Sequence, residues 1–290
     1  MLNLEALPKP LQLAVQHDSY DGGVATDIST TSLIDSPRVK RLQREHKDKI
    51  QEDATRRIMS LLGTTWHSVM EANAPSGWIV EKRFYATTQR GLVISGAIDA
   101  LEPVGDRHNV RDYKVTTSWR ANKLGNLQPD DADCDEQFVH QLNIYGWLIS
   151  KNGMTPNKLY IDALIRDWSD GKSKSAGYPD YPVMSYEIPL WPFNKTEAHI
   201  ESQLARHYGE DLPRCTDEER WLRGSKYLVR KVGAKRNARV FDTETEAKEW
   251  ADEAKGDYKV LYEPGEATRC ERNFCGVAEW CEQYKEDKND

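Results

Sequence analysis

Two carboxylates and one lysine lie close together in the chain, with the types and spacing that metal-assisted hydrolysis needs. Asp99 ends the run SGAID, and Asp112 and Lys114 lie in the run VRDYK. Asp112 and Lys114 are two positions apart, so in a strand both side chains project from the same face. Asp99 is near the end of the preceding predicted strand. A short turn lets these two strands pair antiparallel, which places Asp99 beside Asp112.

These side chains together indicate a divalent cation. Two carboxylates at contact distance repel each other unless a cation lies between them, and oxygen ligands favour Mg²⁺ or Mn²⁺. Such a cation would polarise a scissile phosphate and acidify the attacking water, while Lys114 positions that water and balances the charge developing on phosphorus. Taken alone, the D-x-K pattern is common, and a strand with an ordinary Asp–Lys ion pair would show it too.

Polar residues on two predicted helices flank this group. His67 and Glu71 are one helical turn apart and share a face of the first helix. Gln141 and Tyr145 stand in the same relation on the second helix. A buried polar stripe is costly unless it is hydrogen-bonded, so these residues either belong to a site or face water.

The order of these motifs resembles that of the RecB-like nucleases in the PD-(D/E)XK superfamily. The motifs are G-x-x-x-H-x-x-x-E, G-x-x-D, D-x-K and Q-x-x-x-Y, and they cover roughly residues 62–147. Similar enzymes include the nuclease domains of the RecBCD and AddAB machines, CRISPR-associated exonucleases and phage exonucleases. The resemblance implies metal-dependent cleavage of DNA.

The resemblance also implies a part for individual residues. The implied metal ligands are His67, Asp99, Asp112 and the main-chain carbonyl of Val115. Lys114 resembles the catalytic lysine, and Gln141 and Tyr145 resemble the motif that holds DNA or organises the site. Glu71 is expected to have a supporting or structural part. The implied catalytic set is His67, Glu71, Asp99, Asp112, Lys114, Gln141 and Tyr145.

Hydrophobic periodicity and turn signals predict the elements that position these residues. Helices are predicted over 52–72, 136–151 and 195–209, and strands over 78–87, 92–103, 110–117, 158–167 and 182–190. Their order indicates an α/β (α+β) sandwich in which helices flank one mixed sheet. With the resemblance, this predicts a restriction-endonuclease-like PD-(D/E)XK core over 51–212. An N-terminal leader and helix precede it over 1–50, and residues 1–27 are predicted to be irregular.

Beyond residue 212 the pattern changes to a cysteine-rich module over 213–290. A ββαβ insert is predicted over 225–264, with strands over 226–231, 237–241 and 258–263 and a helix over 243–254. Cys215 precedes this insert, and Cys270, Cys275 and Cys281 follow it. Four thiolates suit a [4Fe–4S] cluster or a structural Zn²⁺. The odd count of five cysteines argues against structural disulfides.

A [4Fe–4S] cluster is favoured over zinc, since zinc ribbons usually present C-x-x-C pairs. The tail also resembles that of RecB-like nucleases in which three cysteines near the C-terminus help to hold such a cluster. In those enzymes the first cysteine usually precedes the nuclease motifs, whereas here the first cysteine is Cys134. Cys215 is preferred as the fourth ligand, because Cys134 lies in an acidic loop beside the predicted catalytic face. Four ordinary thiols are the alternative.

Two basic stretches are candidate contacts for DNA. The predicted hairpin carries Lys226, Arg230, Lys231, Lys235, Arg236 and Arg239, with no acidic residue among them. Arg120 and Lys123 form a second stretch just past the D-x-K strand. Cations concentrated in this way could follow a phosphate backbone, although a solvated hairpin can be basic without binding anything.

Composition and charge exclude several classes of function. With 290 residues, 38% hydrophobic and 30% charged, the chain has the composition of an ordinary globular protein. A net charge of −7 argues against coating nucleic acid through bulk charge but allows a local basic path. Apolar runs are too short to cross a membrane, and the N-terminus has no secretory signal. A cytoplasmic protein is therefore expected. With the resemblance, the compact size and the lack of a helicase G-x-x-x-x-G-K-[ST] motif suggest an accessory nuclease of a phage or mobile element in a bacterial host.

Together these features predict a Mg²⁺- or Mn²⁺-dependent DNA exonuclease acting in the recombination or repair of phage or mobile-element DNA. Its expected partners are DNA and a recombination or single-strand-annealing protein. An endonuclease of the same chemistry is one alternative. A catalytically silent DNA-binding scaffold is another, and the intact set of Asp99, Asp112 and Lys114 argues against it.

Overall fold

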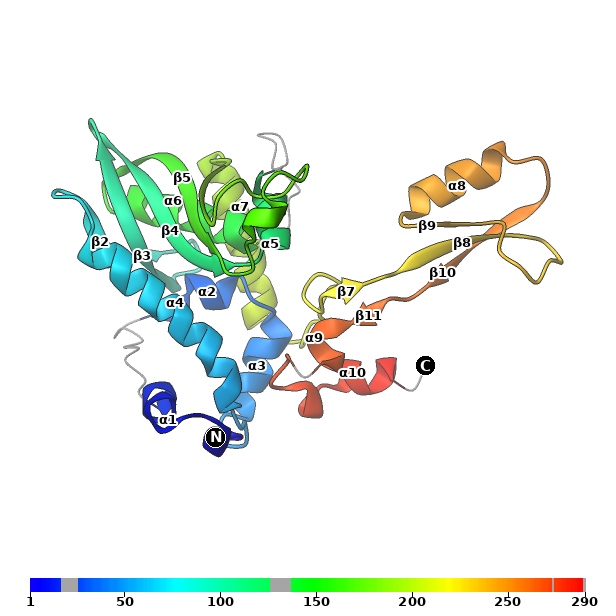
Figure 1. The fold of residues 1–290 in the computed structure, drawn as a ribbon, viewed down its shortest axis with the longest axis horizontal. Coiled ribbons are helices and arrows are strands. Elements are labelled where there is room, and N and C mark those ends of the chain that lie inside the picture. Colours follow the sequence, from blue (N-terminus) through cyan, green and yellow to red (C-terminus); the bar gives the residue numbers. More distant parts are fainter. Residues whose placement is uncertain (17–25, 126–136, 273, 289–290) are drawn as a thin grey trace. The chain divides into compact units, whose positions relative to one another are not determined.

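The computed structural model describes residues 1–16, 26–125, 137–272 and 274–288. The chain forms two compact units (Figure 1). The first comprises residues 1–40 and 51–212, and the second comprises residues 41–50 and 213–290. The predicted acidic loop, with Cys134, lies outside the described residues.

A six-stranded mixed sheet forms the centre of the first unit. β2 (Ile79–Thr87), β3 (Val93–Val104) and β4 (Arg107–Thr116) form an antiparallel meander, β5 (Thr155–Ile165) is parallel to β4, and β6 (Val183–Ile188) is antiparallel to β5. Parallel neighbouring strands need a crossover connection, and α6 (Gln137–Lys151) is part of the connection between β4 and β5. The prediction of one mixed sheet is confirmed.

β3 and β4 separate just before the residues predicted to be catalytic. Their ladder ends at the pair Ala100↔Arg111. Farther toward its start, β3 pairs instead with the short strand β1 (Ile28–Ser29), while β4 continues beside β5. Asp99 and Asp112 are the first residues past the end of the ladder, so they border an opening between the two strands.

Helices cover both faces of this sheet, as the sequence predicts. Because neighbours along a strand alternate between faces, Asp112 and Tyr113 point to opposite sides. Gln141 of α6 donates a hydrogen bond to Asp112, whereas the ring of His67 meets the ring of Tyr113 edge-on. His67 belongs to α4 (Ala54–Ala72), so α4 and α6 lie on opposite faces (Figure 1).

The close approach of α6 to β3 depends on Gly96, the glycine of the G-x-x-D motif. A Cβ at this position would lie 2.6 Å from Cε1 of Tyr145 and 2.9 Å from Cδ1 of Leu148, both on α6. Real side chains do not tolerate such distances, so any larger residue would push the helix away from the strand. α7 (Phe193–Tyr208) then packs against α6.

The N-terminal segment is not all irregular, which corrects the prediction for residues 1–27. It contains the helix α1 (Lys9–Gln16), whose Val15 is buried. Pro10 lies in the first turn of α1, where a missing N–H costs little because that group has no partner within the helix. The proline near the helix start therefore does not break it. None of the helices in the described residues is long and apolar enough to span a membrane.

Short helices complete the first unit and lead into the second. They are α2 (Thr30–Leu33), α3 (Pro37–Glu45) and α5 (Ser118–Gly125), together with the 3₁₀ turns η1 (Leu4–Ala6) and η2 (Asp170–Lys172). α3 runs across the boundary between the two units.

The second unit contains a three-stranded sheet with one helix. The sheet has the order β10 (Tyr258–Glu263), β8 (Lys226–Lys231), β9 (Arg239–Phe241), and the helix is α8 (Glu244–Glu253). These elements match the predicted ββαβ insert. β7 (Leu222–Arg223) and β11 (Glu266–Ala267) pair at its base, followed by α9 (Thr268–Glu271), η3 (Ala278–Trp280) and α10 (Glu282–Asp287).

Candidate metal centre

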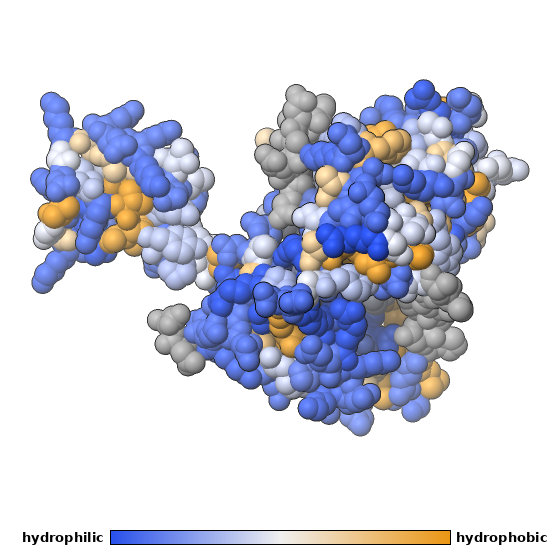
Figure 2. All heavy atoms as spheres, turned by 180° about the vertical axis from the view of Figure 1, so that it is seen from behind, coloured by the Kyte–Doolittle hydropathy of each residue, from blue (hydrophilic) through white to orange (hydrophobic). Residues whose placement is uncertain are grey.

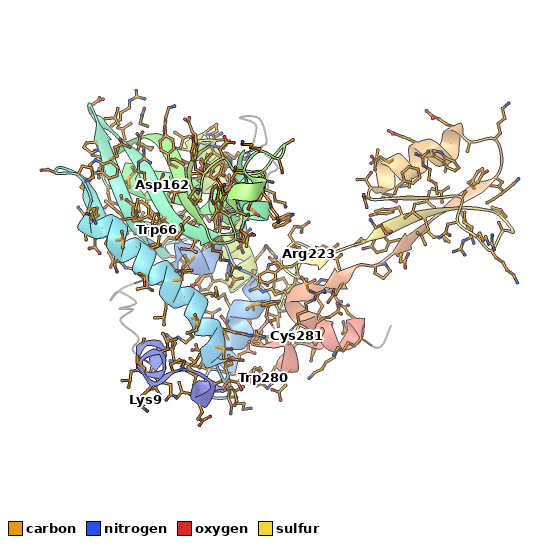
Figure 3. All side chains as sticks on the ribbon, viewed as in Figure 1. Lys9, Trp66, Asp162, Arg223, Trp280 and Cys281 are labelled. Carbon is orange, nitrogen blue, oxygen red and sulfur yellow. The ribbon has the colours of Figure 1, made fainter. Side chains whose placement is uncertain are left out.

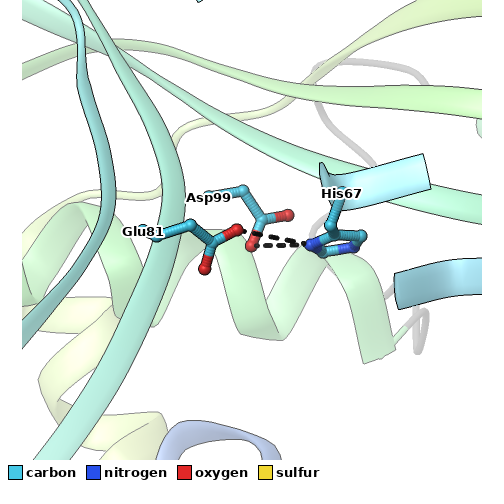
Figure 4. Close-up of side chains that lie close together, drawn as sticks. All are labelled: His67, Glu81 and Asp99. Carbon is cyan, nitrogen blue, oxygen red and sulfur yellow. Dashed lines mark ion pairs between the residues drawn. The ribbon is translucent and has the colours of Figure 1, made fainter. Parts of the chain in front are cut away.

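Three side chains from three elements of the first unit converge on one point. His67 of α4, Glu81 of β2 and Asp99 of β3 each offer a ligand atom, and these atoms all lie within 4.8 Å of one another (Figure 4). Nδ1 of His67 is 3.6 Å from Oε1 of Glu81 and 3.6 Å from Oδ1 of Asp99. Nε2 of His67 donates a 2.8 Å hydrogen bond to the carbonyl of Tyr113. Because the proton is on Nε2 in the neutral ring, Nδ1 presents a lone pair to the two carboxylates.

Glu81 is part of this group, and the sequence prediction missed it. Its backbone has φ 47°, whereas its neighbours Val80 and Lys82 pair regularly with β3. A non-glycine residue with positive φ is strained by roughly 1–2 kcal/mol. The usable signal is the register of the hairpin, because Val80↔Ala100 and Lys82↔Ile98 put Glu81 opposite Asp99.

Asp99 is held in a fixed orientation within the opening between β3 and β4. Its Oδ2 accepts a 2.6 Å hydrogen bond from the backbone nitrogen of Tyr113, and the residue is 6% exposed. Burial and then the negative charge of Asp112 raise the pKa of Asp99 to about 7. Burial lowers the pKa of His67, but its contacts with Glu81 and Asp99 outweigh this and raise that pKa above its ordinary value.

The buried Asp112 and the half-buried Lys114 form an ion pair beside this group. Nζ of Lys114 lies 2.5 Å from Oδ2 of Asp112, which is 1% exposed. Gln141 donates through Nε2 to Oδ1 of Asp112 at 3.2 Å and to the hydroxyl of Tyr145 at 2.8 Å. Gln141 and Tyr145 are buried, so this polar stripe does not face water and its hydrogen bonds lie within the protein.

The remaining residues of the expected site lie farther along the same elements. Val115 is half-buried in β4, where it is paired with Leu164 of β5. Glu71 is exposed near the end of α4. Of the expected ligands, His67 and Asp99 belong to the tight group, while the carboxylate of Asp112 is engaged by Lys114 and Gln141.

This arrangement fits a divalent cation. Two carboxylates and an imidazole lone pair face one another, with Nδ1 of His67 3.6 Å from each carboxylate and all three ligand atoms within 4.8 Å. The raised pKa of Asp99 reflects the cost of keeping this carboxylate charged there. A cation would remove that cost. Carboxylate oxygens suit Mg²⁺ or Mn²⁺, and the imidazole nitrogen tilts the preference toward Mn²⁺.

The second unit brings the four predicted cysteine ligands together. Cys270 and Cys281 are buried, and Cys215 and Cys275 are half-buried. Burial and then the charges of Cys275, Cys215 and Cys281 raise the pKa of the Cys270 thiol to about 12. The four sulfurs are therefore close enough to interact electrostatically.

Backbone and side-chain hydrogen bonds position these cysteines. The amide of Gln283, on α10, accepts from the backbone nitrogen of Cys215 at 2.7 Å and donates to its carbonyl at 3.1 Å. The backbone nitrogen of Cys275 donates to the carbonyl of Arg269 at 2.7 Å. Cys281 directly precedes α10 (Figure 3). The turns around α9 and α10 thus face Cys215, although the insert separates them in sequence.

The expected DNA contacts lie in both units. In the first unit, the guanidinium of Arg120 stacks 4.0 Å from the ring centroid of Phe138, and Lys123 lies over Trp119. In the second unit, Lys226 forms an ion pair with Asp242. The exposed cations of the hairpin are Lys231, Lys235, Arg236 and Arg239, and the half-buried Arg230 donates to Asn237.

Comparisons with known proteins bear on the family. A family model described as the PD-(D/E)XK nuclease superfamily matches residues 22–282. No curated protein matches the chain at a significant level. Among solved structures, the crystal structure of SSO0001 is similar with a TM-score of 0.43 and 19% identity, over 75% of this chain and 87% of that one. That similarity is too low to bear on activity.

Proposed function

Because the chain belongs to the PD-(D/E)XK nuclease superfamily, we propose that it is a DNA exonuclease whose phosphodiester hydrolysis depends on Mg²⁺ or Mn²⁺. The observation that carries this proposal is the group formed by His67, Asp99, Asp112 and Lys114 at the opening between β3 and β4. Carboxylates that could bind a cation lie there next to a lysine that could contact a phosphate group.

His67, Glu81 and Asp99 would hold the cation, with Asp112 beside them. When bound, a divalent cation polarises the scissile phosphate and activates the attacking water. His67 offers Nδ1, because its Nε2 donates to Tyr113. Asp99 offers Oδ1, because its Oδ2 accepts a hydrogen bond from the backbone nitrogen of Tyr113. The backbone carbonyl and nitrogen of Tyr113 thus orient two proposed ligands, His67 and Asp99.

Lys114 is the fixed positive charge of the proposed site. Its ion pair with the buried Asp112 keeps the ammonium group close to the opening between the strands. From there it can neutralise the charge that develops on the phosphate oxygens as the bond breaks. Gln141 donates to Asp112 and so keeps this carboxylate from turning away when Lys114 engages the substrate.

We propose DNA as the substrate and a strand end as the point of attack. Arg120 and Lys123 follow the D-x-K strand, and the hairpin over 226–241 adds a second cationic stretch. Each stretch by itself could contact a phosphate backbone. The exonuclease mode is supported by the resemblance to RecB-like enzymes, with an endonuclease of the same chemistry as the alternative.

We further propose that Cys215, Cys270, Cys275 and Cys281 hold a [4Fe–4S] cluster, with a structural Zn²⁺ as the alternative. The convergence of the four thiols supports a shared group, and the lack of C-x-x-C pairs favours the cluster over zinc. Such a group would tie the base of the ββαβ insert together. A module this small buries little apolar surface, so the bound group would contribute folding free energy.

We place this activity in the recombination or repair of phage or mobile-element DNA, in the bacterial cytoplasm and beside a recombination or single-strand-annealing protein. The test uses linear and circular DNA, each single- and double-stranded, with Mg²⁺ or Mn²⁺. An exonuclease degrades linear DNA and spares closed circles, whereas an endonuclease cuts both. Asp112→Asn is the matched inactive control. Wild-type protein that binds DNA but cleaves none of these substrates with either metal would be a scaffold, and the proposal would fail.

A further inference from the structure

The helix of the ββαβ insert covers one face of its three-stranded sheet. Trp250 of α8 contacts the rings of Phe241 and Tyr258, with centroids 6.3 and 5.3 Å apart. Val229 of β8 and Ala247 of α8 are fully buried between the sheet and the helix. The register places Phe241, Val229 and Tyr258 on one face, so α8 lies on that face.

The opposite face of the sheet carries a row of three aliphatic side chains. Leu228 in the central strand is paired directly with Val240 on one side and Leu261 on the other. Leu228 and Leu261 are half-buried, and Val240 is 49% exposed. Apolar surface of this module is visible in Figure 2. The next pair along this face, Arg230↔Lys259, is cationic.

Charge is divided between the two sides of the module. α8 carries Glu244, Glu246, Glu249, Asp252 and Glu253 against one lysine, Lys248. Of the six basic residues of the hairpin over 226–241, Lys226 and Arg230 lie on the uncovered face, and the exposed Lys235 and Arg236 lie in the turn. Lys231 and Arg239 lie on the α8 face, and Lys226 is paired with Glu263 across the strands. An anionic partner would therefore meet the strand side and be repelled by the helix side.

We propose that the uncovered face formed by Leu228, Arg230, Val240, Lys259 and Leu261, with the hairpin turn, is a docking surface for duplex DNA. This inference rests on DNA being the substrate and adds which form of DNA the module meets. Its cations match a phosphate backbone, and its aliphatic row can contact thymine methyl groups, which lie in the major groove. That groove, about 12 Å wide, admits a two-stranded β-ribbon.

The position of the aromatic residues argues against single-stranded DNA. Single-strand binding surfaces stack bases on aromatic side chains. Here Tyr227, Phe241, Tyr258 and Tyr262 lie on the face that carries α8. Of these, Tyr262 is 51% exposed, and its ring contacts that of Tyr227. The uncovered face offers aliphatic and cationic groups, which suit groove edges and phosphates better than unstacked bases.

The test measures binding of the full chain to a labelled 20-base-pair duplex and to the matching single strand, without divalent metal so that no cleavage intervenes. Lys259→Gln lies on the uncovered face, and Lys248→Gln, on α8, is the matched control with the same charge change. Lys259→Gln should weaken duplex binding about three- to tenfold and reduce the salt dependence by about one phosphate contact. Lys248→Gln should stay within about twofold of wild type.

A second pair of variants tests the aliphatic row. Val240→Ser lies on the uncovered face, and Val104→Ser, at 42% exposure at the end of β3 in the first unit, is the control of similar exposure. Only Val240→Ser should lower duplex affinity, with thermal melting confirming that both variants fold. Equal losses for Lys259→Gln and Lys248→Gln, a larger loss for the single strand, or no loss at all would each overturn the proposal. The last outcome would assign the face to a protein partner. Because no cleavage is measured, the result stands apart from the nuclease assay.

Discussion

Asp99 accepts a 2.6 Å hydrogen bond from the backbone nitrogen of Tyr113, across the opening between β3 and β4. In a continuous ladder that nitrogen would donate its hydrogen bond to the neighbouring strand. Here the strands have separated after Ala100↔Arg111, so the amide is available to a side chain. One carboxylate oxygen is thereby fixed, and the other is turned toward His67. The break in the sheet is what allows the candidate metal centre to form.

Asp99→Asn, Asp112→Asn and Lys114→Ala should each abolish cleavage of DNA. Loss of a metal ligand or of the charge-neutralising lysine removes on the order of several kcal/mol of transition-state stabilisation. Single-turnover cleavage of labelled DNA measures this, with circular dichroism to confirm the fold. Asp106→Asn, in the exposed turn between β3 and β4, should cleave as wild type does. Near-normal activity in any two of the three site variants would remove the assignment.

Glu81→Gln and Glu81→Gly should both reduce the rise in melting temperature that Mn²⁺ produces. Binding to the native state raises stability according to ligand concentration over Kd, so a lost ligand shows directly in this shift. Without metal, Glu81→Gly should melt no lower than Glu81→Gln, because glycine relieves the strain at φ 47°. Thermal melts with and without Mn²⁺ supply both readouts. If Mn²⁺ raised the melting temperature of both variants as much as that of the wild type, Glu81 would not be a ligand.

Gly96→Ala should destabilise the first unit by about 1–3 kcal/mol, since the new methyl group overlaps Tyr145 and Leu148. Displacing α6 would also disturb the hydrogen bond from Gln141 to Asp112, so activity should fall with stability. Gly63→Ala is the contrasting change in α4, where nothing lies within 4 Å. It should be stabilising by up to about 1 kcal/mol, because alanine is the better helix former. Urea unfolding compares the two, and equal stabilities would contradict the packing role of Gly96.

Acidification should destabilise the fold through His140 and His199, whose rings lie 4.3 Å apart. Burial lowers the pKa of each to about 4. The charges of His199 and Lys195 add to this at His140, and the charges of Lys195 and Arg206 add to it at His199. The unfolded chain takes up these protons near pH 6.5, so stability is full above that pH and falls between about 6.5 and 4. The loss approaches about 1.4 kcal/mol per pH unit for each histidine.

Urea unfolding at pH 7 and pH 5 measures this dependence. The double variant His140→Gln/His199→Gln should lose less stability than wild type between the two pH values, because carboxylates common to both proteins cancel in the comparison. The same loss in both proteins would show that these rings do not control the acid response.

Cys275→Ser should abolish the brown colour expected of anaerobically purified protein, lower its melting temperature and weaken DNA binding. The reason is that the bound group would close the base of the ββαβ insert, so loss of one of its four ligands would remove the folding free energy that it contributes. Iron and zinc analysis, together with visible absorbance, checks the identity of the group. Cys134→Ser is the control and should change none of these properties. Colourless protein with one equivalent of zinc would establish zinc instead, and protein with neither metal and an equally stable Cys275→Ser variant would remove the bound group.

Local pattern determined much of the architecture. Asp112 and Lys114 share a face because side chains alternate along any strand, and the pattern of β2 to β4 is visible in apolar runs separated by turn residues. The family could also be recognised from the order of its motifs, and the match over residues 22–282 confirms it. Each of these signals depends on residues within one element or on their order in the chain.

Tertiary structure alone decided which of these groups meet. Glu81 enters the candidate metal centre through the pairing of β2 with β3 and a positive φ that its own sequence does not favour. Gln141 could equally have faced water until the packing of α6 buried it against Asp112. Cys215 lies close to the tail cysteines although the insert separates them in sequence. Register, burial and loop closure join residues far apart in the chain, so they have no local sequence signal.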